Sequence, residues 1–357
     1  MAFRTERTLT QRELNRALLA RQLLLERARL PIPRALERLG GIQNQYAPNA
    51  YLRLWSCLED FRRDDLTRAL ERRTVVQGTL MRETIHVVSK QDYARFAAGI
   101  RASGQDWWRR VNKIPDDVDM RAFAKRARTF FRGSVRSRNE IEEFLLANDF
   151  PRASIWGFSH WLDLIRVPPS GTWEQRRASL FALAEEWVGA LDATEEEGIE
   201  HLVRRYLGGF GPASRNDISS WSKVPMAKLA PVLERMTLRR FGDEQGKELL
   251  DLPRAPLPDP ETPAPVRFLP TWDATLLVHA RRTGILPERY RALVFSTKTP
   301  QSVGTFLVDG EVAGTWRHHA GRVETAPFER LGRAVQRSLR EEADRLAAFH
   351  DQEPLTQ

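Results

Sequence analysis

The stretch Val75–Val88 reads VVQGTLMRETIHVV, and it determines the fold class that we expect. It is rich in β-branched residues and predicts two strands joined by a tight reversal. Helical patterns come before it, one running from Leu14 to Leu25 and another from Asp64 or Asp65 to about Arg73. Helices followed by a strand hairpin are the outline of a winged helix, so we expect one here.

The same outline recurs twice along the chain. In the second copy, residues 119–133 and 137–148 have helical patterns, Pro151 opens a third helix through Ile165, and Val167–Trp173 follows as a wing. In the third copy, a helix over 195–207 precedes a helix–turn–helix pair and two strands, expected at Ala213–Trp221, Pro225–Arg235, Thr237–Phe241 and Glu248–Leu250. The pattern therefore predicts three tandem winged helices.

A proline-rich segment separates these units from the rest of the chain. Residues 253–265 hold six prolines in thirteen positions, which predicts an extended, stiff connector. Short strands follow, at Val266–Leu269, Thr275–Val278, Val303–Val308 and Glu311–Arg317, and a helix from Glu329 to Phe349 closes the chain. We expect a mainly α protein with a small β part, divided into winged-helix units at 1–115, 116–193 and 194–252, a linker at 253–265 and a C-terminal β-domain, barrel-like or a sheet, at 266–357.

Composition narrows the class of protein. Of 357 residues, 41% are hydrophobic and 29% charged, and Lys+Arg exceed Asp+Glu by 56 to 47. The net charge of +9 favours a polyanionic partner, most often nucleic acid. Cys57 is the only cysteine and the seven histidines form no ligand pattern, so we expect no disulfide, metal or cofactor. The chain has no run of 18 apolar residues and no apolar leader, so we expect a cytoplasmic protein without membrane contact.

The chemistry that we expect centres on Gly40–Tyr46, GGIQNQY. Gln43 and Gln45 share a face if the backbone is extended, and the two glycines before them allow sharp turns. A carboxamide does not titrate near neutral pH, but it orients water and places a carbonyl dipole against developing positive charge. Such a pair suits a reaction whose leaving group needs no protonation. An ordinary polar loop after a helix is the alternative.

Several stretches together resemble one family, the AlkZ/YcaQ group of winged-helix DNA glycosylases, bacterial enzymes that unhook interstrand crosslinks and remove bulky alkylated bases. The matching stretches occur in the family's order across nearly the whole chain. They are Leu39–Gln45 with Leu54-Trp55, Arg82-x-Thr84–Val88, Val167–Trp173, Gly211–Ala213 with Trp221, Leu269-Pro270-x-x-Asp273, and Val308–Gly310 with Gly314–Arg317.

This resemblance implies three winged helices packed into a C-shape with a C-terminal β-barrel. It also implies a catalytic motif of glutamine, an aliphatic residue and glutamine, in which the YcaQ-like branch replaces the second glutamine by an acidic residue. Gln43 and Gln45 fall on those positions, so the chain is similar to the AlkZ-like branch. Asn44 stands where an aliphatic side chain is usual.

From this resemblance we expect a monofunctional DNA glycosylase. It would hydrolyse the N-glycosidic bond of cationic N7- or N3-alkylated purines, or of crosslinks between them, and leave an abasic site. The expected partner is damaged duplex DNA, and we expect a monomer associated with a bacterial nucleoid.

Two groups of residues accompany the glutamines as candidates. The expected DNA-binding residues are polar or basic positions in the helix–turn–helix units and after a later strand, namely Arg152, Ser154, His160, Arg215, Asn216, Lys223, Arg281 and Arg282. The candidates for supporting the site are Asn44, His86 and Asp273. For any one cation, a solvated surface position is the alternative, and His86 on an alternating strand is also typical of a core residue.

Two other functions fit the same pattern. Tandem winged helices serve transcriptional regulators that bind DNA without chemistry, and there the glutamines would be dispensable. A degenerate family member that binds distorted DNA without cleaving it is the other alternative, because Asn44 departs from the motif.

Overall fold

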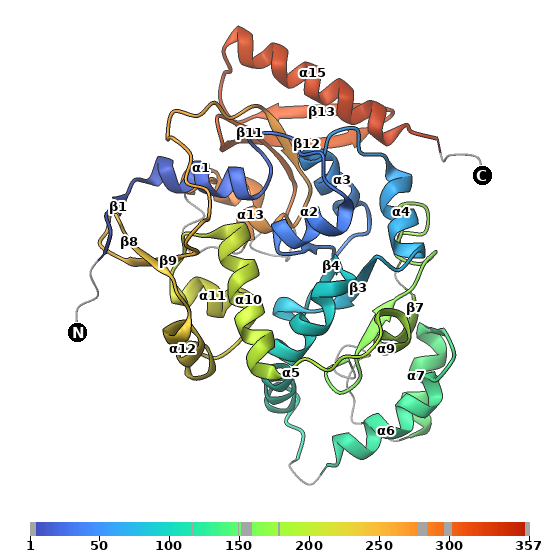
Figure 1. Ribbon diagram of the computed structural model, residues 1–357. Coiled ribbons are helices and arrows are strands. Elements are labelled where there is room, and N and C mark those ends of the chain that lie inside the picture. Colours follow the sequence, from blue (N-terminus) through green and yellow to red (C-terminus); the bar gives the residue numbers. More distant parts are fainter. Residues whose placement is uncertain are drawn as a thin grey trace.

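The protein, a computed structural model, is described over residues 5–115, 118–148, 150, 159–177, 179–277, 284–295 and 302–353. It is mainly helical, and its strands form sheets of three, four and six members. Figure 1 shows the four-stranded sheet at the top under α15, the six-stranded sheet to the right of centre, and the three-stranded sheet at the left. Among the described residues, no helix is long and apolar enough to cross a membrane.

The six-stranded sheet has the order β2-β4-β3-β6-β7-β5 and holds the predicted hairpin. Strands β3 (Val75–Thr79) and β4 (Ile85–Ser89) pair antiparallel across the short turn η1 (Met81–Glu83), which confirms that hairpin. Strand β2 (Ile42–Gln43) lies at one edge, beside β4. At the other side of the hairpin, β3 pairs with β6, so strands from the first two expected units share one sheet.

The helices that contact this sheet are α2 (Ile32–Leu39), α3 (Pro48–Cys57), α4 (Arg63–Glu71) and the long α5 (Lys90–Val111). Helix α10 (Glu195–Phe210) packs on α2 and α5. The closest helix pair is α5 against α10, where Gly99 faces Gly198. A Cβ on Gly198 would lie 2.3 Å from the Gly99 nitrogen, so only glycine allows this approach. The crossing fixes α10 beside the turn that leads to the glutamines.

The second unit contains α6 (Met120–Phe131), α7 (Arg138–Ala147), α9 (Ala184–Val188) and strands β5 (Arg136–Ser137), β6 (Leu164–Arg166) and β7 (Leu180–Leu183). The expected helix through Ile165 is wrong at its end, because Leu164–Arg166 is a strand paired with β3 and β7. Burial between two strands overrides the helical spacing there. The expected wing at Val167–Trp173 is the turn after β6 and not a strand, and residues 151–158 lie outside the described part of the chain.

The third unit follows its prediction closely. Helices α11 (Arg215–Ser222) and α12 (Met226–Arg235) precede the hairpin of β8 (Arg239–Asp243) and β9 (Glu248–Asp251). Ser214 caps α11 by accepting from the Asp217 amide, and Asp217 accepts in return from the Ser214 backbone. The N-terminal strand β1 (Thr8–Leu9) adds to β8 in parallel, which the sequence pattern did not indicate.

The C-terminal part is an open sheet and not the expected barrel. Its order is β10 (Arg267–Leu269), β11 (Gly304–Val308), β12 (Glu311–His319) and β13 (Arg322–Pro327), and within the described residues β10 and β13 are not paired with each other. Helix α15 (Arg333–His350) packs on it, and α13 (Ala274–Leu277), η3 (Glu288–Tyr290) and α14 (Arg291–Val294) lie in the connection. The expected strand at Thr275–Val278 is wrong over residues 275–277, because Asp273 caps a short helix there.

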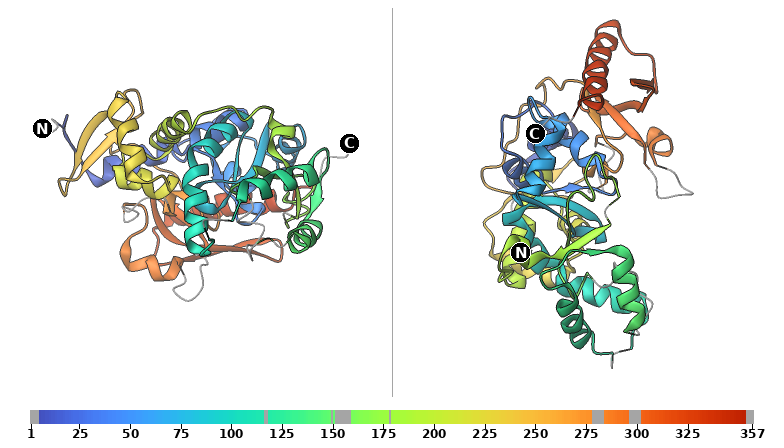
Figure 2. Two further views of the ribbon diagram at one scale, coloured as in Figure 1. Left: turned by 90° about the horizontal axis from the view of Figure 1, so that it is seen from below. Right: turned by 90° about the vertical axis from the view of Figure 1, so that its right-hand side faces the viewer.

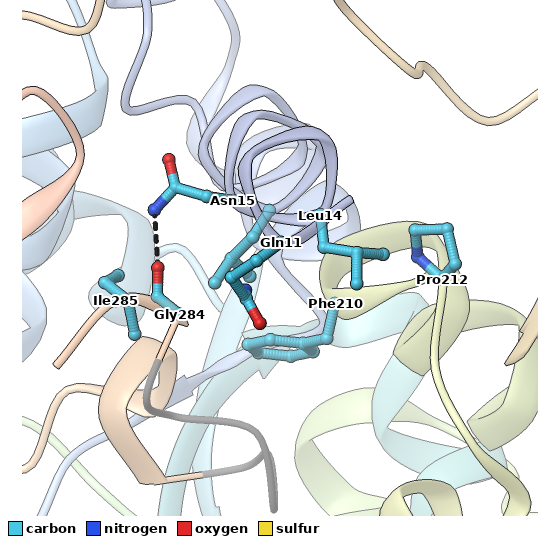
Figure 3. Close-up of a pocket in the computed structure, with 8 residues that line it drawn as sticks. Gln11, Leu14, Asn15, Phe210, Pro212, Gly284 and Ile285 are labelled. Atoms are coloured by element: carbon cyan, nitrogen blue, oxygen red, sulfur yellow. Dashed lines mark hydrogen bonds between the residues drawn. The ribbon is translucent and has the colours of Figure 1, made fainter. Parts of the chain in front are cut away.

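Helix α1 (Gln11–Arg21) contacts segments from the later part of the chain. The right-hand view of Figure 2 shows α15 and the C-terminal sheet at the opposite end of the molecule from α6 and α7. Arg21 is fully buried, donates to both carboxylate oxygens of Asp251 at 2.7 and 2.8 Å, and also donates to the Pro256 carbonyl in the proline-rich segment. Asn15 donates to the Gly284 carbonyl at 2.8 Å, at the edge of a small pocket lined by Leu14 and Phe210 (Figure 3). The connector is therefore held in place along α1.

Candidate active site

Two glycines bring the chain from α2 into the site. Gly40 ends α2 with a φ of 76°, and Gly41 has a φ of 83°, both in the left-handed region that glycine adopts without strain. A Cβ on Gly41 would lie 2.9 Å from Val88 Cγ1 in β4. The double glycine thus lets β2 pair closely with β4, which places Gln43 opposite His86.

Gln43 is buried, with 7% of its surface exposed. Arg82 donates a hydrogen bond to the Gln43 carboxamide oxygen. Arg82 and its neighbour Glu83 both have left-handed backbones, with φ of 55° and 59°. The η1 turn is thus joined to Gln43 through the Arg82 side chain.

Gln45 is exposed, two residues further on. The strand β2 ends at Gln43, and the chain bends at Gln45. The two glutamines therefore do not lie on one extended strand, which is the arrangement in which they would share a face. The Gln45 oxygen accepts from the Ile85 backbone amide at 2.8 Å. A carbonyl oxygen has two lone pairs, so one contact fixes each glutamine oxygen and one lone pair stays available for water.

Asn44, between them, points into the protein and is 3% exposed. Its amide donates to the Gln77 oxygen at 3.1 Å, and its oxygen accepts from the Ala50 backbone amide at 3.1 Å. Gln77 in turn donates to the Gly171 carbonyl at 2.8 Å. Asn44 thus locks the glutamine segment onto β3 and the start of α3 through polar contacts.

A small cavity next to Gln43 is also lined by Arg53, Pro270 and Asp273. Asp273 is 5% exposed, and its Oδ2 lies 3.1 Å from Arg53 Nε in an ion pair. Its Oδ1 accepts from the amide and hydroxyl of Thr275 at 2.9 and 2.7 Å. Arg53 also donates to the backbone and side-chain oxygens of Gln22, both at 2.9 Å. The carboxylate that lines this cavity is therefore committed to an ion pair and a helix cap.

His86 is buried beside Gln43, and it is neutral. Burial lowers the pKa of its imidazole to about 3, and the charge of Arg82 adds to this effect. The ring's Nδ1 lies 3.0 Å from the Thr84 carbonyl, a contact that requires the proton on Nδ1. His86 is thus a satisfied core histidine. It lies on β4, opposite Gln43 of β2.

The expected DNA-binding residues of the third unit lie on α11 or at its C-terminal end. Helix α11 contacts the η1 turn, which carries Arg82. On α11, Asn216 is exposed and Arg215 is partly buried, 3.6 Å from Glu248. Lys223 is exposed at the end of the helix. The exposed residues of this helix are therefore polar or basic, and the helix itself packs beside η1.

The other expected DNA-binding residues are placed differently. His160 Nε2 lies 3.0 Å from a Glu83 carboxylate oxygen, so it contacts the η1 turn. Arg152, Ser154, Arg281 and Arg282 lie outside the described residues. Sequence reasoning did not identify Arg53 and Arg82 as functional candidates. Arg82 belongs to one of the matching stretches, which was a usable signal, whereas the partners of Arg53 come from distant segments.

No group of three or more His, Cys, Asp or Glu residues in the described part of the chain is placed to hold a metal ion. Cys57 is buried, and its burial raises the pKa of the thiol. The chemistry of the site is thus that of carboxamides, guanidinium groups and one committed carboxylate.

Both the sequence and the fold of this chain are similar to those of known proteins. The family described as DNA glycosylase AlkZ-like matches residues 36–349. Among solved structures, the Streptomyces sahachiroi DNA glycosylase AlkZ superposes with a TM-score of 0.81 at 19% identity, over 96% of this chain and 97% of that chain. No curated protein matches the sequence. The superposition supports the fold, and the family match spans most of the chain.

Proposed function

This chain belongs to the AlkZ-like DNA glycosylase family, and we propose that it hydrolyses the N-glycosidic bond of cationic N7- or N3-alkylated purines in duplex DNA. Such a base already carries a positive charge, so it leaves without a proton from the protein. The sugar becomes an oxocarbenium-like cation that water then attacks. The product is an abasic site without strand scission.

In the proposed mechanism, both glutamines act through their carboxamide dipoles. The Gln45 oxygen is anchored by the Ile85 amide, and its other lone pair accepts a hydrogen bond from the attacking water. Gln43, oriented by Arg82, helps to position that water near C1′. Water placement and preorganised dipoles each contribute about 10²–10³ in rate.

The observation that carries this proposal is the neutrality of the glutamine pair. Asp273 is the one carboxylate lining the Gln43 cavity, where its Oδ1 accepts from Thr275 and its Oδ2 is ion-paired with Arg53. A committed carboxylate is a poor general base. The site therefore suits substrates that bring their own charge and disfavours neutral adducts, whose departure requires an acid.

The position of Gln45 supports a further part of the proposal, the unhooking of interstrand crosslinks. A crosslinked base cannot rotate fully out of the duplex, so its C1′ must be reached from an open surface. Gln45 is exposed, and the exposed side chains of Asn216 and Lys223 lie on α11 next to η1. An exposed glutamine flanked by a polar helix suits such a substrate.

Incubation with defined duplexes tests the proposal. One duplex carries N7-methylguanine, another a nitrogen-mustard crosslink, and a third a neutral adduct that requires protonation. We expect alkali-labile abasic sites from the first two and little from the third. A protein that binds DNA according to its sequence and forms no abasic site on any duplex would be a regulator instead, and the proposal would be wrong.

A further inference from the structure

A pocket of about 420 Å³ lies beside the glutamines, where α3 meets the C-terminal sheet near the top of Figure 1. Neighbouring residues of the chain connect it to the glutamine site. Tyr46 lines the pocket directly after Gln45, and Thr271 lines it directly after Pro270, which lines the Gln43 cavity. Its volume lies within the range of about 300–1,000 Å³ that is usual for small-ligand sites. The mechanism proposed above does not use it.

The walls of this pocket are aromatic. Tyr46 is 43% exposed, which is unusual for a large ring in this protein, and the indoles of Trp173 and Trp316 also line the pocket. The rings of His318 and His350 stack with centroids 4.0 Å apart and planes 5° apart. Among these rings Tyr46 is exposed, whereas Trp173 is only 5% exposed, and an exposed face such as that of Tyr46 stacks on flat rings such as nucleobases.

Two buried polar atoms in the pocket lining have no partner within the described protein. Asn49 is 2% exposed, and its oxygen accepts from the Thr271 hydroxyl at 3.1 Å, but its amide nitrogen has no partner. The same is true of Nε2 of His350, whose ring is neutral because burial lowers its pKa to about 3. Buried polar atoms are normally paired, and the carbonyl oxygens and ring nitrogens of a base edge are suitable partners.

Two cations stand at the rim of the pocket. The Arg176 guanidinium carbon lies 5.7 Å from the Tyr46 ring centroid and 5.9 Å from that of Trp173, and Arg176 donates to the Tyr46 hydroxyl. Arg317 is exposed and pairs with Glu324 on the neighbouring strand. Guanidinium groups beside an aromatic slot suit a flat ring that carries a phosphate.

We propose that this pocket holds one undamaged nucleobase of the bound DNA, unstacked from its neighbours, with its phosphate at Arg176. The base would stack against Tyr46 and present its edge to Asn49. A flat adduct ring could use the same walls, but it would bring no phosphate to the two guanidinium groups, so a nucleotide fits better. Holding such a base open would expose C1′ of a crosslinked neighbour that cannot itself rotate out.

This inference rests on the proposed function in taking DNA to lie at the glutamines, but its test needs no hydrolysis. The full-length protein is titrated with undamaged duplexes that carry either a single bulged thymine or an abasic residue at the same bulge. We expect the bulged thymine to bind about tenfold more tightly, which is within the range for one base–aromatic stack. Tyr46→Ala should remove this preference, and Tyr46→Phe should keep it.

Two further variants sharpen the test. Leu146→Ala, at a position 80% exposed on α7 and outside the pocket, should keep the preference for the bulged base. Arg176→Gln should reduce the salt dependence of binding by about one phosphate contact. Equal binding of the two bulged duplexes, or a preference that survives Tyr46→Ala, would overturn the proposal.

A second pair of duplexes distinguishes the two sources of a flat ring. Both are fully paired, and they carry an N7 adduct with either an aromatic or a methyl substituent. If Tyr46→Ala weakens binding only to the aromatic adduct, while the bulged base gives no preference, the pocket serves the adduct and the nucleotide assignment is wrong. Failure here would leave base excision by the glutamines intact, since abasic-site formation is measured separately.

Discussion

At the scale of single residues, the site is built by side chains that hold the glutamines from behind. Arg82 orients Gln43, the Ile85 amide orients Gln45, and Asn44 fastens the segment to Gln77 and Ala50. The family resemblance places an aliphatic residue at the position of Asn44. In this chain the polar residue there is compensated, because each of its hydrogen-bonding groups has a partner.

This compensation predicts that Asn44→Leu destabilises the protein, although it restores the usual motif. The substitution leaves the Gln77 oxygen and the Ala50 amide unpaired in the interior, at about 1–3 kcal/mol for each group. Urea denaturation should show a clear loss in the free energy of unfolding. Asn216→Leu, at an exposed position of α11, is the control and should change it little. An equal effect of both substitutions would show that the hydrogen bonds of Asn44 do not stabilise the fold.

His86 makes the stability of the fold depend on pH. Its pKa in the folded protein is about 3, against an ordinary value of 6.5. Above pH 6.5 the ring is neutral in both states. As the pH falls from 6.5 toward 3, the unfolded chain binds a proton that the folded one does not, so stability falls by about 1.4 kcal/mol per pH unit.

We expect His86→Asn to remove this contribution. The difference in unfolding free energy between wild type and variant, measured by urea denaturation at pH 7, 6 and 5, should shift in favour of the variant as the pH falls. A difference that stays constant over this range would mean that His86 titrates normally in the folded protein.

At the scale of elements, structure that is encoded by neighbouring residues was predicted well. Structure that depends on contacts between distant segments was not. The β3–β4 hairpin and the α11–α12 pair are encoded by runs of neighbouring residues and by the Ser214–Asp217 cap. By contrast, Leu164–Arg166 is a strand because β3 and β7 flank it, and the open C-terminal sheet depends on pairing between remote segments. The glutamine positions were found from a motif, whereas the Arg53–Asp273 pair joins residues 220 positions apart and has no local signal.

The crossing of α5 and α10 also rests on such a distant contact, and it predicts opposite effects for two glycines of one helix. A Cβ on Gly198 would lie 2.3 Å from the Gly99 nitrogen, so Gly198→Ala should destabilise by about 1–3 kcal/mol. On the same helix, a Cβ on Gly208 would meet only Leu252, at 3.8 Å, so Gly208→Ala should stabilise by up to about 1 kcal/mol. Chemical denaturation of both variants checks the crossing, and stabilisation by Gly198→Ala would contradict it.

At the scale of the whole molecule, the buried Arg21 of α1 joins segments that lie 186 to 235 residues away in the sequence. Arg21 binds Asp251 at the end of β9, the Leu207 carbonyl of α10 and the Pro256 carbonyl of the proline-rich segment. These contacts hold α10, β9 and the proline-rich connector against α1. The connector is therefore part of the packed structure.

Breaking this junction should destabilise the whole fold. Arg21→Met leaves Asp251 buried without a counter-charge, which costs about 3–5 kcal/mol. Adding Asp251→Leu should restore much of the loss, because no unpaired charge then remains. Arg12→Met, on the exposed side of the same helix, is the control and should have little effect in thermal or urea denaturation. A small effect of Arg21→Met would show that the junction is not cooperative.

The central claim is that two neutral carboxamides suffice when the substrate supplies the positive charge. The most direct measurement is single-turnover release of N7-methylguanine from duplex DNA by the wild type, Gln43→Ala and Gln45→Ala, at saturating enzyme with DNA binding checked separately. We expect each variant to bind the duplex normally and to lose about 10²–10³ in rate. Release at the wild-type rate by both variants would contradict the claim.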